Sequence, residues 1–218
     1  MTETSLTLAE LVSTQPAAAR VLHRLRLDFC CGGRRSLAEA CAERGLEVDR
    51  VLTEIAAERP ASDDDVEQLS SGELTDYIVT RFHEPLRREL PRLCELAKKV
   101  ERVHRDKPEC PRGLAAHLDE VHNAILSHLA KEEQILFPLI QSGRAHLAQM
   151  PVRVMIQEHD DHAANLQRTR DLTGDLEIPL VACTSWRALY TGLLELELEL
   201  MKHIHLENNV LFPAVLHG

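Results

Sequence analysis

The sequence predicts an all-α protein in which a small N-terminal helical domain precedes a four-helix bundle. No segment shows sustained strand alternation, and every long segment repeats its apolar residues at steps of three and four. Proline and glycine divide the second half of the chain into four such segments. With 218 residues, 44% of them hydrophobic and 28% charged, the chain can bury a sizeable core.

Changes in composition suggest where the parts begin and end. We expect a small helical domain with a cysteine pair over residues 1–58, an acidic linker over 59–72 and the four-helix bundle over 73–218. The linker region is rich in serine and aspartate and has few apolar residues to anchor it.

Four short helices are expected in the N-terminal domain. Apolar spacing predicts the first over 6–12, the second from Thr14 to Leu25 and the last over 48–55. A Ser-x-x-Glu pattern at Ser36 predicts a capping box that begins the third helix, and Gly45 is expected to end it.

The second of these helices is followed by Asp-Phe-Cys-Cys-Gly-Gly at residues 28–33. Two glycines accept backbone angles that other residues resist, so Cys30 and Cys31 are expected on a tight, exposed turn. Arg34, Arg35 and the N-terminus of the next helix are expected to lower a thiolate pKa and make the pair reactive. The remaining cysteines are predicted to be small core residues, namely Cys41, Cys94, Cys110 and Cys183.

Each helix of the predicted bundle has one inward stripe that contains histidine. The first stripe begins with Val79 and His83 and extends to His104, and the third contains His159 and His162. Steps of three and four keep the residues of a stripe on the face that a bundle helix turns toward its neighbours.

The second and fourth stripes contain a histidine and a glutamate four residues apart. Their inward residues in this region are His128, Glu132 and Ile135 in the second helix, and His203, Glu207 and Val210 in the fourth. Both motifs lead into Leu-Phe-Pro and lie 75 residues apart, while His83 and His159 lie 76 apart. The bundle is therefore predicted to be a duplicated helix hairpin.

The inward glutamates need positive charge close to them. Residues four apart lie one above the other on a helix, so each His-Glu pair points into the interior. Burying an ionised carboxylate without a partner is costly, and no lysine or arginine lies on the four stripes. A single inward histidine is more often a hydrogen-bonded core residue, so the prediction depends on all six side chains reaching one level. Metal cations would then supply the charge.

The six side chains are too many ligands for one tetrahedral zinc ion. If both glutamates bridge, each of two metals receives two imidazoles and two carboxylate oxygens, and room remains for an oxo or hydroxo bridge. Mixed imidazole and carboxylate ligation suits iron or manganese and does not choose between them.

The second domain resembles the hemerythrin-like bundles, and the entire chain is similar to the iron-sulfur cluster repair di-iron proteins. The resemblance depends on the cysteine motif at 28–33 and on the doubled His-x-x-x-Glu-x-x-x-Leu-Phe-Pro, with further likeness at 99–108 and 131–138. It implies two iron ions as the metals and redox thiols at Cys30 and Cys31. It implies metal ligands at His83, His128, Glu132, His159, His203 and Glu207.

The same resemblance implies a function in restoring iron-sulfur clusters damaged by nitric oxide or peroxide. Damaged iron-sulfur proteins would be the partners, the chain would form a homodimer, and donation of iron is the expected activity. Two other functions stay open. Two ferrous ions could reduce nitric oxide, making the chain a reductase or scavenger, or the bundle could bind nitric oxide or dioxygen as a sensor or carrier.

Two positions depart from the oxygen-carrying hemerythrins. Those proteins have a second histidine where this sequence has Ala163, and an aspartate where it has Glu207. One imidazole fewer should leave the metals more accessible, which suits donation better than oxygen storage.

The remaining histidines are not expected to bind metal directly. His162 could orient a metal ligand through a contact with its far side, or it could replace a lost ligand. His104 lies about six turns from His83 and is expected to make a polar contact near the bundle end, although it could also support a ligand. The others are expected at the surface, namely His23, His117, His122, His146, His205 and His217.

Charge and hydropathy exclude some partners. The net charge of −10 repels phosphate backbones and anionic lipid, so nucleic acid is not expected as a partner. No apolar stretch approaches the roughly 18 residues that a membrane span needs, and the first residues lack the layout of a secretory signal. We therefore expect a cytoplasmic protein with reduced cysteines and no membrane partner.

Overall fold

The computed structural model describes residues 6–58 and 66–217. Within these residues the regular structure is helical, and the β-pairing amounts to an isolated antiparallel bridge between Thr7 and Ser36. The prediction of an all-α fold is confirmed. None of the described helices is both long enough and apolar enough to cross a lipid bilayer.

The contacts between residues divide the chain into two compact units. The first unit combines Met1–Leu74 with Leu200–Gly218, and the second is Thr75–Glu199. This division differs from the one expected from composition, and the expected domain boundaries stay a prediction.

The expected linker over 59–72 is described only in its second half, because residues 59–65 lie outside the described part of the chain. A 3-10 helix η2 (Val66–Gln68) follows, and α5 (Ser71–Ile78) begins before the expected linker ends. The Ser70 side chain accepts a hydrogen bond from the Glu73 amide at 3.3 Å, and the Glu73 carboxylate accepts one from the Ser70 amide at 2.9 Å. This reciprocal cap explains why α5 begins here.

Four short helices occur in the N-terminal part, as predicted: α1 (Leu8–Thr14), α2 (Ala18–Arg24), α3 (Leu37–Arg44) and α4 (Val48–Ala57). The prediction that Thr14 begins the second helix is wrong, because Thr14 is the last residue of α1. Its hydroxyl donates to the carbonyl of Glu10 at 2.8 Å and so extends the first helix instead.

The predicted boundaries of α3 are confirmed. Ser36 and Glu39 form the capping box, with the Glu39 amide 3.2 Å from the Ser36 hydroxyl. The helix ends at Gly45, whose φ of 65° is a left-handed conformation that a side chain would strain.

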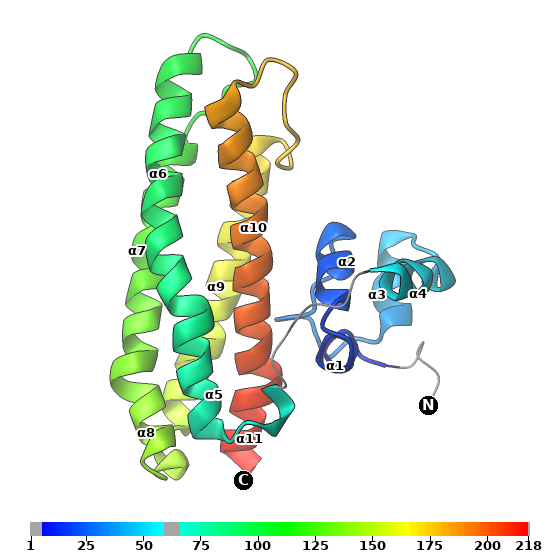
Figure 1. Ribbon diagram of the computed structural model, residues 1–218, viewed down its shortest axis with the longest axis vertical. Coiled ribbons are helices and arrows are strands. Elements are labelled where there is room, and N and C mark those ends of the chain that lie inside the picture. The colour runs from blue at the N-terminus through cyan, green and yellow to red at the C-terminus, as the bar shows by residue number, and fades with distance from the viewer. Residues whose placement is uncertain (1–5, 59–65, 218) are drawn as a thin grey trace. The chain divides into compact units, whose positions relative to one another are not determined.

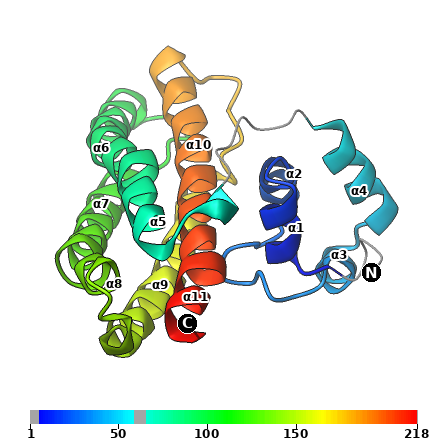
Figure 2. The ribbon, with the colours of Figure 1, turned by 60° about the horizontal axis from the view of Figure 1, so that its bottom comes forward.

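Four long helical segments make up the bundle, and Figures 1 and 2 show α6, α7, α9 and α10 lying side by side. α7 packs against both α6 and α9. The segments are α5 with η3 (Val79–His83) and α6 (Glu84–His104); α7 (Leu114–Lys131) with η4 (Glu132–Leu136) and α8 (Phe137–Gln141); η5 (Ala145–Leu147) with α9 (Gln149–Thr173); and α10 (Thr184–Leu206) with η6 (Glu207–Leu211) and α11 (Phe212–His217).

Three of these segments contain a π-helical turn, namely η3, η4 and η6. A π turn holds one residue more than an α turn, so the inward face moves by one residue beyond it. The expectation that Ile135 faces inward is therefore wrong, because Ile135 is 53% exposed and Leu136 only 1%. The same shift buries Leu211 in place of Val210.

A buried ion pair joins α9 and α10. The Arg170 guanidinium donates to the Glu197 carboxylate through two nitrogens, at 2.8 Å each, and both residues are buried. Arg170 also contacts Asp175 at 3.3 Å. The bundle interior thus contains one arginine and one glutamate that the inward stripes did not include, and they neutralise each other.

Candidate metal centre

All six predicted metal ligands are buried side chains, none more than 2% exposed. One histidine ends a π turn, the other three lie within long α-helices, and the two glutamates each begin a π turn. Their positions are His83 in η3, His128 in α7, Glu132 in η4, His159 in α9, His203 in α10 and Glu207 in η6.

These six residues form two overlapping groups that could each hold a metal ion. Within each group the ligand atoms all lie within 4.8 Å of one another. Glu132 and Glu207 belong to both groups. The first group adds His83 and His203, and the second adds His128 and His159.

His83 Nδ1 is held by the carboxylate of Glu133, a residue that the inward stripes do not include. His83 Nδ1 lies 2.7 Å from Glu133 Oε1, and Arg87 donates to the same carboxylate at 2.8 Å. Burial works to raise the pKa of Glu133, but the hydrogen bonds from His83 and Arg87 outweigh it, and the net result is a lowered pKa. An ionised carboxylate only accepts, so the proton of His83 is on Nδ1 and the lone pair is on Nε2, toward the centre.

His128 is held in the same way from another helix. Its Nδ1 lies 3.0 Å from Glu158 Oε2, and Lys131 forms an ion pair with the other oxygen of Glu158. Burial again opposes ionisation, and hydrogen bonds from Lys131 and His128 lower the pKa of Glu158. The lone pair of His128 therefore also lies on Nε2.

The spacing of the inner donor atoms fits metal ligation. Glu132 Oε1 lies 3.2 Å from His128 Nε2, and the other oxygen lies 3.4 Å from His83 Nε2. Neighbouring ligands about 2.1 Å from one ion and about 90° apart are themselves about 3 Å apart. The carboxylate of Glu132 thus places one oxygen near each histidine.

The other pairs show the same spacing. His203 Nε2 lies 3.0 Å from Glu207 Oε1, and the Nε2 atoms of His128 and His159 are 3.2 Å apart. Two imidazole nitrogens this close, facing carboxylate oxygens, form a nitrogen and oxygen donor set that suits a first-row transition metal.

The two ambiguous histidines occupy different places. His162 is buried and packs edge-on against the ring of His128, with the centroids 4.9 Å apart. Its expected role in orienting a ligand stays a prediction. His104 Nε2 lies 3.2 Å from Cys183 Sγ, and its ring lies 4.9 Å from that of Trp186. The preferred expectation of a polar contact for His104 agrees with these neighbours.

Some of the expected environments are wrong. His117 and His205 are buried rather than exposed. Inside the bundle, His117 Nε2 lies 3.0 Å from Thr169 Oγ1. Cys183 is exposed rather than a core residue. The side chain of His217 lies outside the described part of the structure.

The cysteine turn is organised by Asp28. The Asp28 carboxylate accepts hydrogen bonds from the amides of Cys30, Cys31 and Gly32, each at 3.0 Å. The Cys30 thiol also donates to it at 3.2 Å. The neighbouring thiol of Cys31, burial and the charge of Asp28 raise the pKa of Cys30 well above its usual range. The expected lowering of the thiolate pKa is therefore wrong for Cys30, which is buried, whereas Cys31 is partly exposed.

Glycine is needed in this turn for a different reason than expected. Positive φ occurs at other glycines of the described chain, and Gly33 is not among them. A Cβ on Gly33 would lie 2.5 Å from the carbonyl oxygen of Phe29 and 2.9 Å from the Cβ of Ala9. The close approach of the backbone therefore excludes a side chain here.

Within the first unit, the cysteine turn contacts the helical turn that follows His203. Asn209 Nδ2 donates to the carbonyl of Cys30 at 3.1 Å, and His205 Nδ1 lies 3.3 Å from the carbonyl of Phe29. Burial lowers the pKa of His205 to about 4, so this residue is neutral at physiological pH. Two backbone carbonyls of the cysteine turn are thus held by side chains from the segment that contains predicted ligands.

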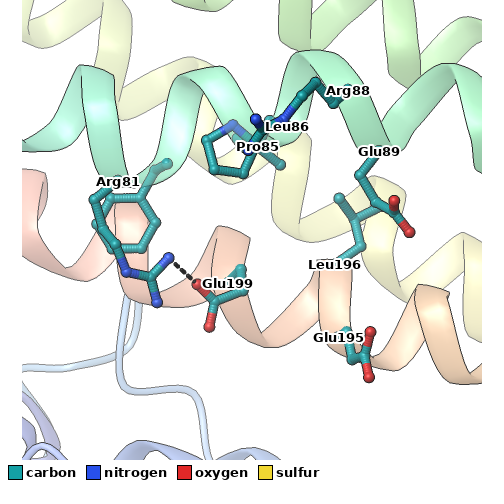
Figure 3. Close-up of a pocket in the computed structure, with 9 residues that line it drawn as sticks. Arg81, Pro85, Leu86, Arg88, Glu89, Glu195, Leu196 and Glu199 are labelled. Carbon is teal, nitrogen blue, oxygen red and sulfur yellow. Dashed lines mark ion pairs between the residues drawn. The ribbon is translucent and has the colours of Figure 1, made fainter. Parts of the chain in front are cut away.

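A groove of about 270 Å³ lies on the outside of the bundle beside η3. Figure 3 shows Pro85 and Leu86 facing it from α6, and Arg81 directed toward Glu199 of α10. The ion pair between Arg81 and Glu199 is 2.6 Å long. Pro85 thus lies on the outer side of its helix.

Comparisons with known proteins agree with the family resemblance. Residues 74–215 match the Hemerythrin HHE cation binding domain, and residues 4–59 match a domain of unknown function, DUF542. Proteins named iron-sulfur cluster repair protein YtfE are 46% identical in Dickeya chrysanthemi strain Ech1591, 45% in Enterobacter sp. strain 638 and 44% in Yersinia pseudotuberculosis serotype O:1b strain IP 31758. Each alignment covers 97% of this chain and 96% of the relative. The chain belongs to the hemerythrin-like family of YtfE iron-sulfur cluster repair proteins.

Proposed function

We propose that this protein repairs damaged iron-sulfur clusters by holding two iron ions in the His/Glu centre and donating iron to the damaged proteins. The names of relatives that align over nearly the whole chain support cluster repair. The match to a cation binding domain and the buried His/Glu groups support a metal centre.

The observation that carries the proposal is that Glu132 and Glu207 are common to both candidate groups. Each group then offers two imidazole nitrogens and two carboxylates, which is the set expected when two carboxylates bridge two metals. Iron held by these residues, with the oxo or hydroxo bridge that we propose, would supply redox chemistry and a releasable cation. His83, His128, Glu132, His159, His203 and Glu207 are the proposed ligands.

The chain's own residues prepare the centre for a cation. Glu133 and Glu158 hold the Nδ1 protons of His83 and His128, so that both rings present a lone pair without first losing a proton. Burial of all six ligands excludes water and strengthens the attraction between the carboxylates and a cation.

We also propose that Cys30 and Cys31 are redox thiols that take part in repair. Cys31 is the more accessible thiol. Cys30 donates a hydrogen bond from its thiol to the Asp28 carboxylate, and this bond keeps the thiol protonated. The family resemblance supports a homodimer that acts in the cytoplasm on damaged iron-sulfur proteins.

The experiment that tests this function is iron transfer. Protein loaded anaerobically with ferrous iron is mixed with an apo-ferredoxin and sulfide, and the return of cluster absorbance is followed. The parent and an exposed-site control, His146→Gln, are expected to restore the cluster, whereas His203→Gln is expected to restore little. If nitrous oxide forms in a single turnover and no iron is transferred, the protein is a nitric oxide reductase instead. If neither activity is observed, the gas-binding sensor is the function that remains.

A further inference from the structure

Each π turn of the bundle is followed by a proline at the same distance. η4 ends one residue before Phe137, whose amide donates to the carbonyl of Glu132, five residues back, and Pro138 comes next. η6 repeats this arrangement, with the amide of Phe212 bonded to Glu207 and followed by Pro213.

η3 has the same bond and the same proline, although its sequence differs. The amide of Glu84 donates to the carbonyl of Val79, again five residues back, and Pro85 follows. α9 has its proline, Pro151, within its first turn, and no π turn interrupts it. Each of the three π turns is therefore followed by a proline, two residues after the turn ends.

A proline in an α-helix removes the amide that would bond the carbonyl four residues back, and its ring clashes with that carbonyl. For Pro138 this carbonyl belongs to Gln134, inside η4. An extra residue in the preceding turn changes which carbonyl faces the ring, so the proline disfavours return to the α-helical register.

Pro91 shows that a proline alone is not sufficient. It lies within α6, and the helix passes through it without a π turn. What distinguishes the other three is that a predicted metal ligand lies within the π turn: His83 ends η3, Glu132 begins η4 and Glu207 begins η6.

The extra residue rotates the helix beyond it by about 100° relative to an uninterrupted α-helix. This rotation lets Glu132 face the centre while Leu136 and Phe137, rather than Ile135, fill the core beyond it. In an uninterrupted α-helix, Glu132 and the apolar residues Leu136 and Phe137 could not all face the interior in their present directions.

We propose that Pro85, Pro138 and Pro213 are positioning residues that keep the three π turns formed when no metal is bound, so that the ligands are already in place. The proposal rests on the proposed metal centre, but it concerns only how the chain holds its ligands. Pro85 lines the outer groove, so it acts on the centre through the backbone rather than by contact (Figure 3).

The test compares Pro138→Ala with Pro91→Ala as the matched control. Both variants restore one backbone amide in a helix, but only residue 138 lies two residues after the end of a π turn. In the metal-free Pro138→Ala protein, the amide of Phe137 is expected to exchange its hydrogen at an altered rate while the melting temperature is unchanged or higher. After ferrous loading, this variant is expected to release iron to ferrozine at least about ten-fold faster than the parent.

Pro91→Ala is expected to release iron at the parental rate. Equal release rates and equal Phe137 exchange in the parent and Pro138→Ala would overturn the inference while leaving the metal centre intact. A parent that binds no iron would overturn the proposed function and this inference together. If Pro138→Ala fails to fold, Pro213→Ala provides the same comparison with the amide of Phe212.

Discussion

At the scale of single residues, the metal centre depends on carboxylates that do not face it. The spacing of His128 and Glu132 on one stripe predicts that both point inward, and the structure buries both. The sequence does not predict the roles of Glu133 and Glu158, because each lies next to a predicted ligand in the sequence and outside the inward stripe of its helix. Which imidazole such a glutamate reaches depends on how helices pack, and no spacing within one helix contains that information.

Replacing Glu133 by glutamine should weaken metal binding. The amide keeps the shape of the carboxylate but loses the charge that holds the Nδ1 proton of His83 and pairs with Arg87. We expect a loss of about 10-fold to 100-fold in metal affinity, measured by competition with a chelator. Glu84→Gln, at an exposed position, is the control, and equal affinities for the two variants would contradict the role of Glu133.

His205 should make the metal-free protein less stable in mild acid. Its pKa is about 4 when folded against about 6.5 when unfolded, so the unfolded chain takes up a proton first as the pH falls through this window. The contribution is complete above pH ~6.5 and is lost by pH ~4, amounting to about 3 kcal/mol.

Denaturant unfolding at several pH values measures this dependence. His205→Gln is expected to flatten the fall in the free energy of unfolding between pH ~6.5 and ~4, whereas His146→Gln, at an exposed histidine, is expected to leave it unchanged. Identical slopes for the parent and His205→Gln would show that His205 titrates normally in the folded protein.

At the scale of helices, the sequence predicts where the elements lie better than how they are wound. Periodicity assumes an α-helix throughout, and it therefore places Ile135 inward where the structure places Leu136. Pro138 was visible as part of the Leu-Phe-Pro repeat, but a proline is also compatible with an ordinary helix, as Pro91 shows. The choice between these outcomes depends on tertiary packing.

The ion pair between α9 and α10 should contribute strongly to bundle stability. Arg170→Leu leaves the buried carboxylate of Glu197 without its bidentate partner, so a loss of about 3 kcal/mol in the free energy of unfolding is expected. Arg168→Leu removes an exposed pair with Glu120 and should cost less than about 1 kcal/mol. Urea unfolding compares the two, and adding Glu197→Leu to the first variant should restore stability. Similar losses for both arginine variants would contradict the assignment.

At the scale of the whole molecule, the duplicated sequence explains the arrangement of the centre. Two copies of His-x-x-x-Glu supply one carboxylate each, and a histidine from the helix before each copy completes the set. The all-α fold and the burial of these six side chains were predictable because the motifs repeat on helices with clear stripes. The raised pKa of Cys30 was not, because it arises from the neighbouring thiol of Cys31, from burial and from the charge of Asp28, which the amides of the turn hold beside the thiol.

The most direct test of the central claim is metal analysis of freshly isolated protein combined with thermal unfolding. We predict about two iron ions per chain, and a melting temperature that falls by several degrees when a chelator removes them, because a ligand bound only by the folded state stabilises it. A chain free of transition metals, with a melting temperature that neither added iron nor chelator changes, would contradict the account.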